Sequence, residues 1–135
     1  MNQLLDLDPR GLNRLRELGG VGLLREMLEL FSVYGAERIA GVTSAQLAMD
    51  AAGIRREVHA LKSSAGQVGA SMIQKLAEDI EHFAQRADVA QCTVLLVDLQ
   101  TAWGRILPLL RQAIDGAGND PLPANAPSTP GTEES

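Results

Sequence analysis

Apolar residues recur every three or four positions along most of the chain, and this spacing predicts amphipathic helices. A short helix is expected over residues 9–18, followed by a long helix from about residue 21 that is weakened near two internal glycines, Gly35 and Gly41. Three further helices are expected over about 51–68, 71–87 and 88–115. Their predicted buried stripes are Leu24, Leu28, Phe31, Ile39 and Val42; Ile54, Val58, Leu61, Ala65 and Val68; Ile73, Leu76, Ile80, Phe83 and Ala87; and Leu95, Leu99, Trp103, Ile106, Leu110 and Ile114.

Local signals mark where these helices begin and end. Acidic N-caps, a proline in the first turn and capping-box sequences predict starts, whereas glycines predict stops. The signals are Asp8 with Pro9, the glycine pair at 19–20, Asp50, the glycine at 69, and the sequences SMIQ (71–74) and DVAQ (88–91). Pro108 lies inside the last helix and predicts a bend there, because its ring crowds the carbonyl of Gly104.

No alternating strand pattern separates these helices, so the expected fold class is all-α. We expect an antiparallel up-down four-helix bundle over residues 20–115, with a short extra N-terminal helix in residues 1–19 that caps the bundle. The segment 116–135 is rich in Gly, Pro, Ser and Asn and predicts a disordered tail.

Composition narrows the function classes. The chain has 135 residues, 45% of them hydrophobic and only 3% aromatic, which favours one helical domain. A net charge of −5 argues against nucleic acid or an anionic membrane as the main partner. One cysteine excludes an intramolecular disulfide, and neither a signal peptide nor an apolar run of membrane-spanning length is evident. We therefore expect a soluble, cytoplasmic monomer.

His59 is the residue that most clearly invites a functional interpretation. At about 100° per residue, the apolar stripe of its helix spans roughly 40° around Ile54, and His59 lies about 140° away, facing solvent. Its predicted neighbours on that surface are two cations and two small residues: Arg55, Lys62, Ser63 and Gly66.

A lone exposed histidine is most often just a solvated residue. The glycines near His59, however, lower helix stability, and their presence requires an explanation. Gly66 and Gly69 each make the helix less stable than alanine would, by roughly 0.5–1 kcal/mol. Open access to the imidazole is one reason; close packing against a neighbouring helix, or a C-cap at Gly69, is the other. Neutral imidazole is a nucleophile near pH 7, and a nearby lysine suits transient phosphorylation. No carboxylate close in sequence orients the ring, so a hydrolytic triad is not expected.

The stretch HALKSSAGQVGA, residues 59–70, resembles the signature of histidine-containing phosphotransfer (HPt) domains, H-x-L-K-(G/S)-S-x-x-x-x-G-A. The flanking sequences LLREMLELF and LAEDIEHFAQRAD are similar to the family's neighbouring helices, so the resemblance covers about residues 8–115. Ser63 stands where many relatives carry glycine, which implies slightly tighter access.

The resemblance implies that His59 accepts a phosphoryl group from a receiver-domain aspartyl phosphate and passes it to another receiver. Lys62 would balance the phosphoryl charge, and Arg55, Ser63 and Gly66 would form the surface that the partner approaches. The implied partners are response-regulator receivers and a hybrid histidine kinase. No cofactor is expected on this chain, and magnesium is expected on the partner receiver.

Other candidate residues carry weaker signals. His82 lies beside the stripe of its helix and is interpreted as structural or solvated. The acidic sequence EDIE (78–81) is interpreted as a solvated face rather than a metal site. Cys92 and Trp103 are expected to be packed side chains.

Two alternatives remain open at this stage. The chain could be a helical adaptor that binds a receiver or kinase without being phosphorylated, or the HPt part of a hybrid or chemotaxis kinase. An autonomous kinase is not expected, because no glycine-rich nucleotide loop is present.

Overall fold

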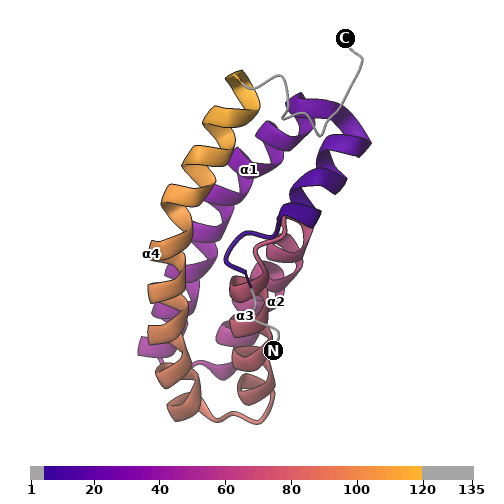
Figure 1. Ribbon diagram of the computed structural model, residues 1–135. Helices are drawn as coiled ribbons and strands as arrows, with labels where there is room; N and C mark the ends of the chain where they lie inside the picture. The colour runs from indigo at the N-terminus through magenta and orange to yellow at the C-terminus, as the bar shows by residue number, and fades with distance from the viewer. Residues whose placement is uncertain (1–4, 120–135) are drawn as a thin grey trace.

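The computed structural model describes residues 5–119, which form four α-helices and no strand. The helices are α1 (Pro9–Leu47), α2 (Ala51–Val68), α3 (Ser71–Gln85) and α4 (Val89–Asn119), joined by connections of two or three residues (Figure 1). The predicted all-α class with four long helices is thereby confirmed.

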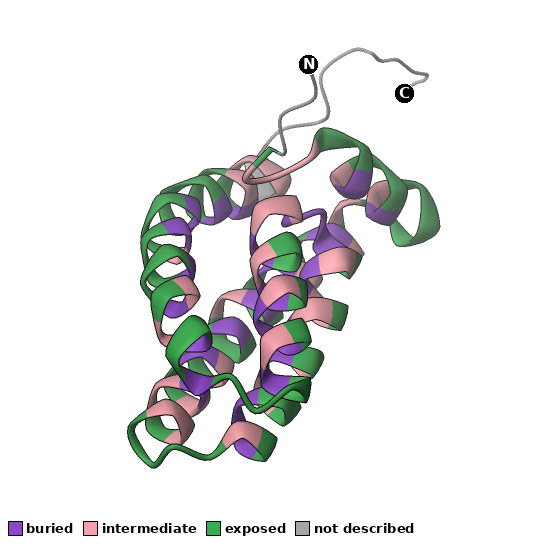
Figure 2. Cartoon of the chain, turned by 90° about the horizontal axis from the view of Figure 1, so that it is seen from below, coloured by how far each residue is buried: buried purple, intermediate pink, exposed green. Residues whose placement is uncertain are grey.

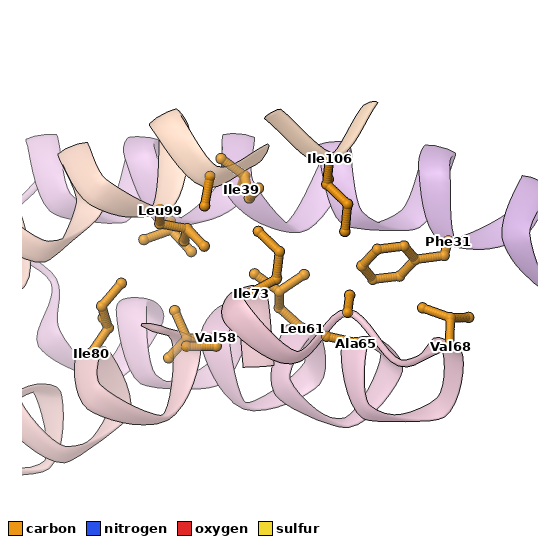
Figure 3. Close-up of a cluster of buried hydrophobic side chains, with 14 of the residues drawn as sticks. Phe31, Ile39, Val58, Leu61, Ala65, Val68, Ile73, Ile80, Leu99 and Ile106 are labelled. Atoms are coloured by element: carbon orange, nitrogen blue, oxygen red, sulfur yellow. The ribbon is translucent and has the colours of Figure 1, made fainter. Parts of the chain in front are cut away.

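The four helices enclose one hydrophobic core. α1 packs against α2 and α4, and α3 packs against the same two helices. Figure 3 shows side chains from all four helices meeting between them, and in Figure 2 the buried residues line the inner sides of the helices. The predicted stripe of α2 is fully buried: Ile54, Val58, Leu61, Ala65 and Val68 are each at most 1% exposed. Because this stripe fixes the rotation of α2, it also fixes which residues α2 presents to solvent.

Element α1 begins at Pro9, and its path is interrupted where the glycine pair lies. Gly19 and Gly20 have non-helical backbone angles, and Gly20 has a φ of 76°. The earlier part of α1 turns away from the longer part at this position (Figure 1). α1 is continuous through Gly35 and Gly41, the two glycines near which a weaker helix is expected. Both glycines instead make room for a neighbour: Trp103 of α4 lies against Gly35, and Glu57 of α2 lies against Gly41.

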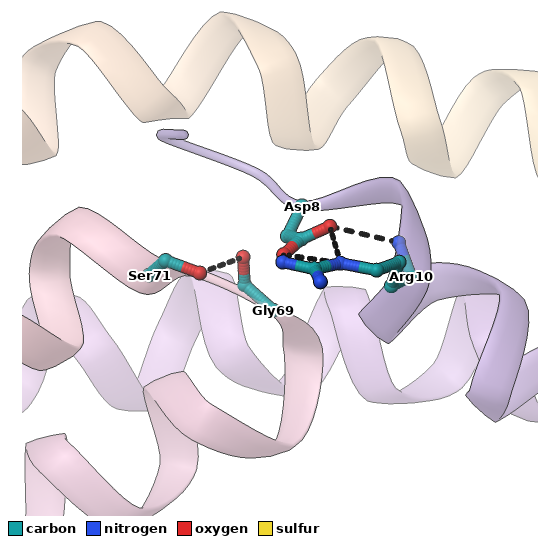
Figure 4. Close-up of polar contacts among 4 residues, drawn as sticks. All are labelled: Asp8, Arg10, Gly69 and Ser71. Carbon is teal, nitrogen blue, oxygen red and sulfur yellow. Dashed lines mark hydrogen bonds and ion pairs between the residues drawn. The ribbon is translucent and has the colours of Figure 1, made fainter. Parts of the chain in front are cut away.

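Most predicted helix ends are confirmed. Asp50 accepts a hydrogen bond from the backbone N–H of Gly53, Asp88 accepts one from that of Gln91, and Gly69 ends α2 with a φ of 78°. The capping box predicted at SMIQ was wrong: Ala70 is the N-cap and caps no N–H with its side chain, while the Ser71 hydroxyl donates to the carbonyl of Gly69 at 3.4 Å (Figure 4). α3 also ends at Gln85, so that the exposed Ala87 is not part of its buried stripe.

The segment before α1 is fastened to the turn between α2 and α3. Asp8 donates its backbone N–H to the Gly69 carbonyl at 2.7 Å, while its carboxylate caps α1 by accepting from the N–H of Arg10 (Figure 4). Gly11 packs so closely on Gly69 that a Cβ at position 11 would lie 2.7 Å from the Gly69 Cα. Two backbone segments distant in sequence therefore meet at a point where neither has a side chain.

α4 runs through Pro108 without a break and continues to Asn119. The predicted start of a disordered tail at residue 116 was therefore wrong for 116–119, and residues 120–135 lie outside the described part of the chain. By length and composition alone, Val89–Ala117 is long and apolar enough to cross a membrane, which the sequence had not led us to expect. Its inward side nevertheless packs into the bundle through Cys92, Leu96, Leu99, Ala102, Ile106 and Leu110, and core helices of soluble proteins share this composition.

Candidate functional site

His59 lies on the outer surface of α2, as its position relative to the buried stripe predicts. Its side chain is 63% exposed, whereas Val58, directly before it, is completely buried. The exposure of His59 is thereby confirmed, and another protein can reach the imidazole without any rearrangement of the bundle.

The carboxylate that holds this imidazole was not predicted from the sequence. Oε2 of Glu81, on α3, lies 2.7 Å from Nδ1 of His59. Glu81 is the only charged or polar residue buried in the described part of the chain, at 6% exposure. The interpretation of EDIE as a wholly solvated face was therefore wrong at its last residue. Glu81 directly follows the buried Ile80, and this place at the edge of the apolar stripe was the one signal that the sequence offered.

Lys62, one turn after His59, binds the other oxygen of the same carboxylate. Its Nζ lies 2.6 Å from Glu81 Oε1, and its side chain is 29% exposed. Glu81 thus joins the two residues that the sequence singled out, one on each carboxylate oxygen. A buried carboxylate needs such partners, because burying an unpaired charge is strongly unfavourable.

The electrostatics of Glu81 determine the hydrogen-bonding state of the imidazole. Burial by itself raises the pKa of Glu81, but the hydrogen bonds from Lys62 and His59 outweigh burial and lower its pKa below the ordinary value of 4.5. Glu81 is therefore ionised near neutral pH and can only accept hydrogen bonds. Nδ1 of His59 must then carry the proton, which leaves Nε2 as the nitrogen with a free lone pair in the neutral ring.

Arginines border His59 on the N-terminal side of α2. Arg55 and Arg56 are exposed and line, together with Ala52, His59 and Glu81, a shallow depression of about 370 Å³. Arg55 was predicted for this surface, and Arg56 was not.

On the C-terminal side, Ser63 is exposed as predicted, but Gly66 is explained differently. A Cβ at Gly66 would lie 2.7 Å from Nε2 of Gln74, on α3. Gly66 thus makes room for a neighbouring helix, which is the packing explanation that the sequence had left open.

An apolar groove lies between α1 and α2 beside this surface. It has a volume of about 440 Å³ and reaches Ser63, one turn from His59. Leu30 and Tyr34 contribute exposed apolar surface to it, at 57% and 38% exposure. The lining residues are Met27, Leu30, Phe31, Tyr34, Ala60, Ser63, Ser64, Gln67 and Val68.

The remaining candidates have structural surroundings. His82 is exposed and stacks edge-on against Phe83, and Trp103 meets Phe31 in the same geometry. Cys92 is buried, with burial raising the pKa of its thiol. Within residues 5–119, no group of three or more His, Cys, Asp or Glu side chains is arranged to hold a metal ion.

Comparison with known families identifies the family of this chain. The family model described as "Hpt domain" matches residues 26–119, more than two thirds of the chain. The chain belongs to the Hpt domain family. The resemblance seen in residues 59–70 is therefore confirmed, and the matched region contains His59, Lys62 and Glu81.

A solved structure of an Hpt protein shares the fold. The crystal structure of histidine-containing phosphotransfer protein B (HptB) from Pseudomonas aeruginosa PAO1 superposes with a TM-score of 0.78 at 22% sequence identity. The match covers 84% of this chain and 97% of that chain. No curated protein sequence matches this chain.

Membership of the Hpt domain family places the chain among the phosphotransfer proteins of phosphorelays. Proteins of this family are phosphocarriers rather than kinases, and they interact with response regulators and histidine kinases.

Proposed function

We propose that this chain is a phosphorelay intermediate that accepts a phosphoryl group on Nε2 of His59 from the aspartyl phosphate of one receiver domain and passes it to the aspartate of another. The observation that carries the proposal is the exposed imidazole of His59 whose Nδ1 is held at 2.7 Å by the buried, ionised Glu81. The second nitrogen of the ring then faces away from the bundle with its lone pair free.

The transfer needs only groups that the two proteins supply. The lone pair of Nε2 attacks phosphorus, the Nε2–P bond forms, and the P–O bond to the receiver aspartate breaks with its electron pair leaving on the carboxylate. The ring gains positive charge as the bond forms, and the Nδ1–H bond to Glu81 stabilises that charge. The reverse sequence delivers the phosphoryl group to the next receiver, so no water or nucleotide is consumed.

Lys62 supports this chemistry by keeping Glu81 ionised. We also retain its predicted part in balancing the phosphoryl charge, because an ammonium has three donors and the contact with Glu81 occupies one. Magnesium for the transfer is expected on the receiver.

The receiver is expected to dock over the groove between α1 and α2. The groove offers exposed apolar side chains beside the phosphoacceptor, which suits a partner that must bring its own active site onto His59. Arg55, Ser63 and Gly66 form the rest of the approach surface.

Several finer inferences accompany this proposal. Connections of two or three residues between consecutive helices favour an antiparallel, up-down path, with residues 9–18 as an extra N-terminal helix. We expect a cytoplasmic monomer that exchanges phosphoryl groups with receivers, including that of a hybrid histidine kinase.

Incubation of the chain with a phosphorylated receiver tests the function. We expect acid-labile, base-stable label on the wild-type chain and on His82→Gln, and none on His59→Gln. Label on His59→Gln, or binding of the receiver without label on the wild type, would show that the chain is not the proposed carrier; the second result would identify a non-phosphorylated adaptor.

A further inference from the structure

Glu81 and Lys62, the two charged residues in contact beside His59, do not supply enough positive charge to balance a phosphoryl group on the imidazole. Glu81 and Lys62 carry opposite charges and are paired at 2.6 Å, so together they contribute almost no net charge to the site. A phosphoryl group on a side chain adds roughly −1.5 to −2 charges near neutral pH. A further source of positive charge is therefore needed where the phosphoryl group would lie.

Arg55 and Arg56 are placed to supply it. They precede His59 by four and three residues on α2, and these are the two spacings at which side chains of one helix are neighbours. Both are exposed, and both line the depression that also contains His59 and Glu81.

These two guanidinium groups lack carboxylate partners, as do Arg14, Arg16, Arg86 and Arg111, but among the described arginines only Arg55 and Arg56 line the depression beside His59. Within residues 5–119, four other arginines form ion pairs with Asp or Glu, whereas neither Arg55 nor Arg56 does so. The nearby Glu57 is engaged elsewhere, since its Oε1 lies 2.9 Å from Arg38 of α1. Adjacent unpaired arginines are notable in a chain whose net charge is −5.

We propose that Arg55 and Arg56 form an anion-binding subsite that holds the oxygens of the phosphoryl group on His59. The inference rests on the proposed function and deepens it by assigning the phosphoryl charge chiefly to these arginines, with Lys62 acting mainly through Glu81. Guanidinium groups suit this role because their planar array of donors matches phosphate oxygens and stays charged at any physiological pH. The subsite stabilises phosphorylated His59 relative to the aspartyl phosphate of the donor.

The equilibrium constant of transfer distinguishes this role from docking. A residue that contacts only the receiver changes the forward and reverse rate constants by the same factor and leaves the equilibrium between the separated proteins unchanged. A residue that binds the phosphoryl group changes the equilibrium itself. The test is to measure both rate constants and the equilibrium constant for transfer from one phosphorylated receiver to the wild-type chain and to the double variant Arg55→Gln/Arg56→Gln.

The double variant should shift the equilibrium toward the phosphorylated receiver by roughly ten-fold, as expected for the loss of charge-assisted hydrogen bonds at an exposed site. Arg55→Lys/Arg56→Lys should recover part of the shift, because it keeps the charge but not the planar geometry. Arg111→Gln is the matched control: it removes an exposed arginine of α4 and should leave the equilibrium unchanged.

An equilibrium constant that stays at the wild-type value in Arg55→Gln/Arg56→Gln would overturn the subsite, even if transfer became slower. A shift in Arg111→Gln that is half as large on a logarithmic scale, and so equal per charge removed, would do the same by indicating a general effect of net charge. Absence of label on His59 of the wild-type chain would instead remove the proposed function, and the subsite with it.

Discussion

Glu81 of α3 reaches across to α2 and places Oε2 2.7 Å from Nδ1 of His59, although the two residues are 22 positions apart in the sequence. This contact selects which imidazole nitrogen is free. It also depends on Lys62, which occupies the second carboxylate oxygen and keeps the buried group ionised.

Replacing Glu81 by glutamine should slow phosphorylation of His59. The amide carries no charge to stabilise the developing imidazolium, so the transfer rate should fall by roughly ten-fold or more, equivalent to losing one charge-assisted hydrogen bond. Glu78→Gln, an exposed change on the same helix, should transfer at the wild-type rate. Because Glu81 is a positioning residue, ¹⁵N NMR of His59 provides a second measurement: the proton should reside on Nδ1 in the wild type and redistribute in Glu81→Gln. Unchanged ring tautomers would contradict this role.

Acid should remove the contribution of Glu81 to stability. Its pKa in the folded chain lies below the ordinary value of 4.5, so the contribution is present above about pH 4.5 and is lost as the pH falls through the folded value. Chemical denaturation should show that Glu81→Gln lowers the free energy of unfolding by about 1 kcal/mol near pH 7. The difference in the free energy of unfolding between Glu81→Gln and the wild type should become smaller in acid. A difference that became larger below pH 4.5 would refute the lowered pKa of Glu81.

Placing a charge in the groove between α1 and α2 should weaken receiver docking. Leu30→Arg introduces a cation into an apolar surface and should raise the KM for a phosphorylated receiver by roughly ten-fold, with little change in kcat. Val97→Arg is the matched control, since Val97 is 59% exposed, close to the 57% of Leu30, but lies on α4. Equal effects of the two variants would show that the groove is not the docking surface.

Two glycine-to-alanine changes should have opposite effects on stability. Gly69 has a φ of 78°, and a Cβ there would lie 2.9 Å from the Asp8 carbonyl oxygen, so Gly69→Ala should lower the free energy of unfolding by about 1–3 kcal/mol. Gly104 lies within α4 with open space around it, and Gly104→Ala should raise the free energy of unfolding by roughly 0.5–1 kcal/mol. Thermal and denaturant unfolding measure both changes, and a neutral Gly69→Ala would show that the turn adapts to a side chain.

The sequence predicted what depends on one helix at a time. The stripe of α2 fixed the outward direction of His59, and Asp50 and Gly69 marked the ends of that helix, because these signals arise from local backbone and solvent preferences. The site beyond His59 was harder to foresee. Whether Glu81 is solvated or buried depends on how α3 rotates against α2, and its place beside Ile80 was compatible with both outcomes.

The same limit applies to the internal glycines of α1, whose packing partners the sequence did not predict. Gly35 and Gly41 looked like weak points because glycine lowers helix propensity, yet Trp103 and Glu57 from other helices occupy the space that a side chain would fill. Similarly, Ser71 matched the composition of a capping box, but the turn at Gly69 and Ala70 starts α3 one residue too early for Ser71 to be the N-cap. In each case the outcome depended on how two helices or segments pack together, and the sequence pattern of a single helix does not contain that information.

His59 and Glu81 lie on two helices joined by the turn at Gly69 and Ala70, and each helix must present its side chain to the other. The number of residues between His59 and Glu81 is therefore sensitive to insertions and deletions. Adding or removing one residue within α3 before Glu81 would rotate that carboxylate by about 100° around the helix, away from the imidazole. A seven-residue insertion would nearly restore the direction but would move the carboxylate along the axis by about 10 Å. During evolution or protein engineering, the stretch from His59 to Glu81 can therefore change its side chains far more readily than its length.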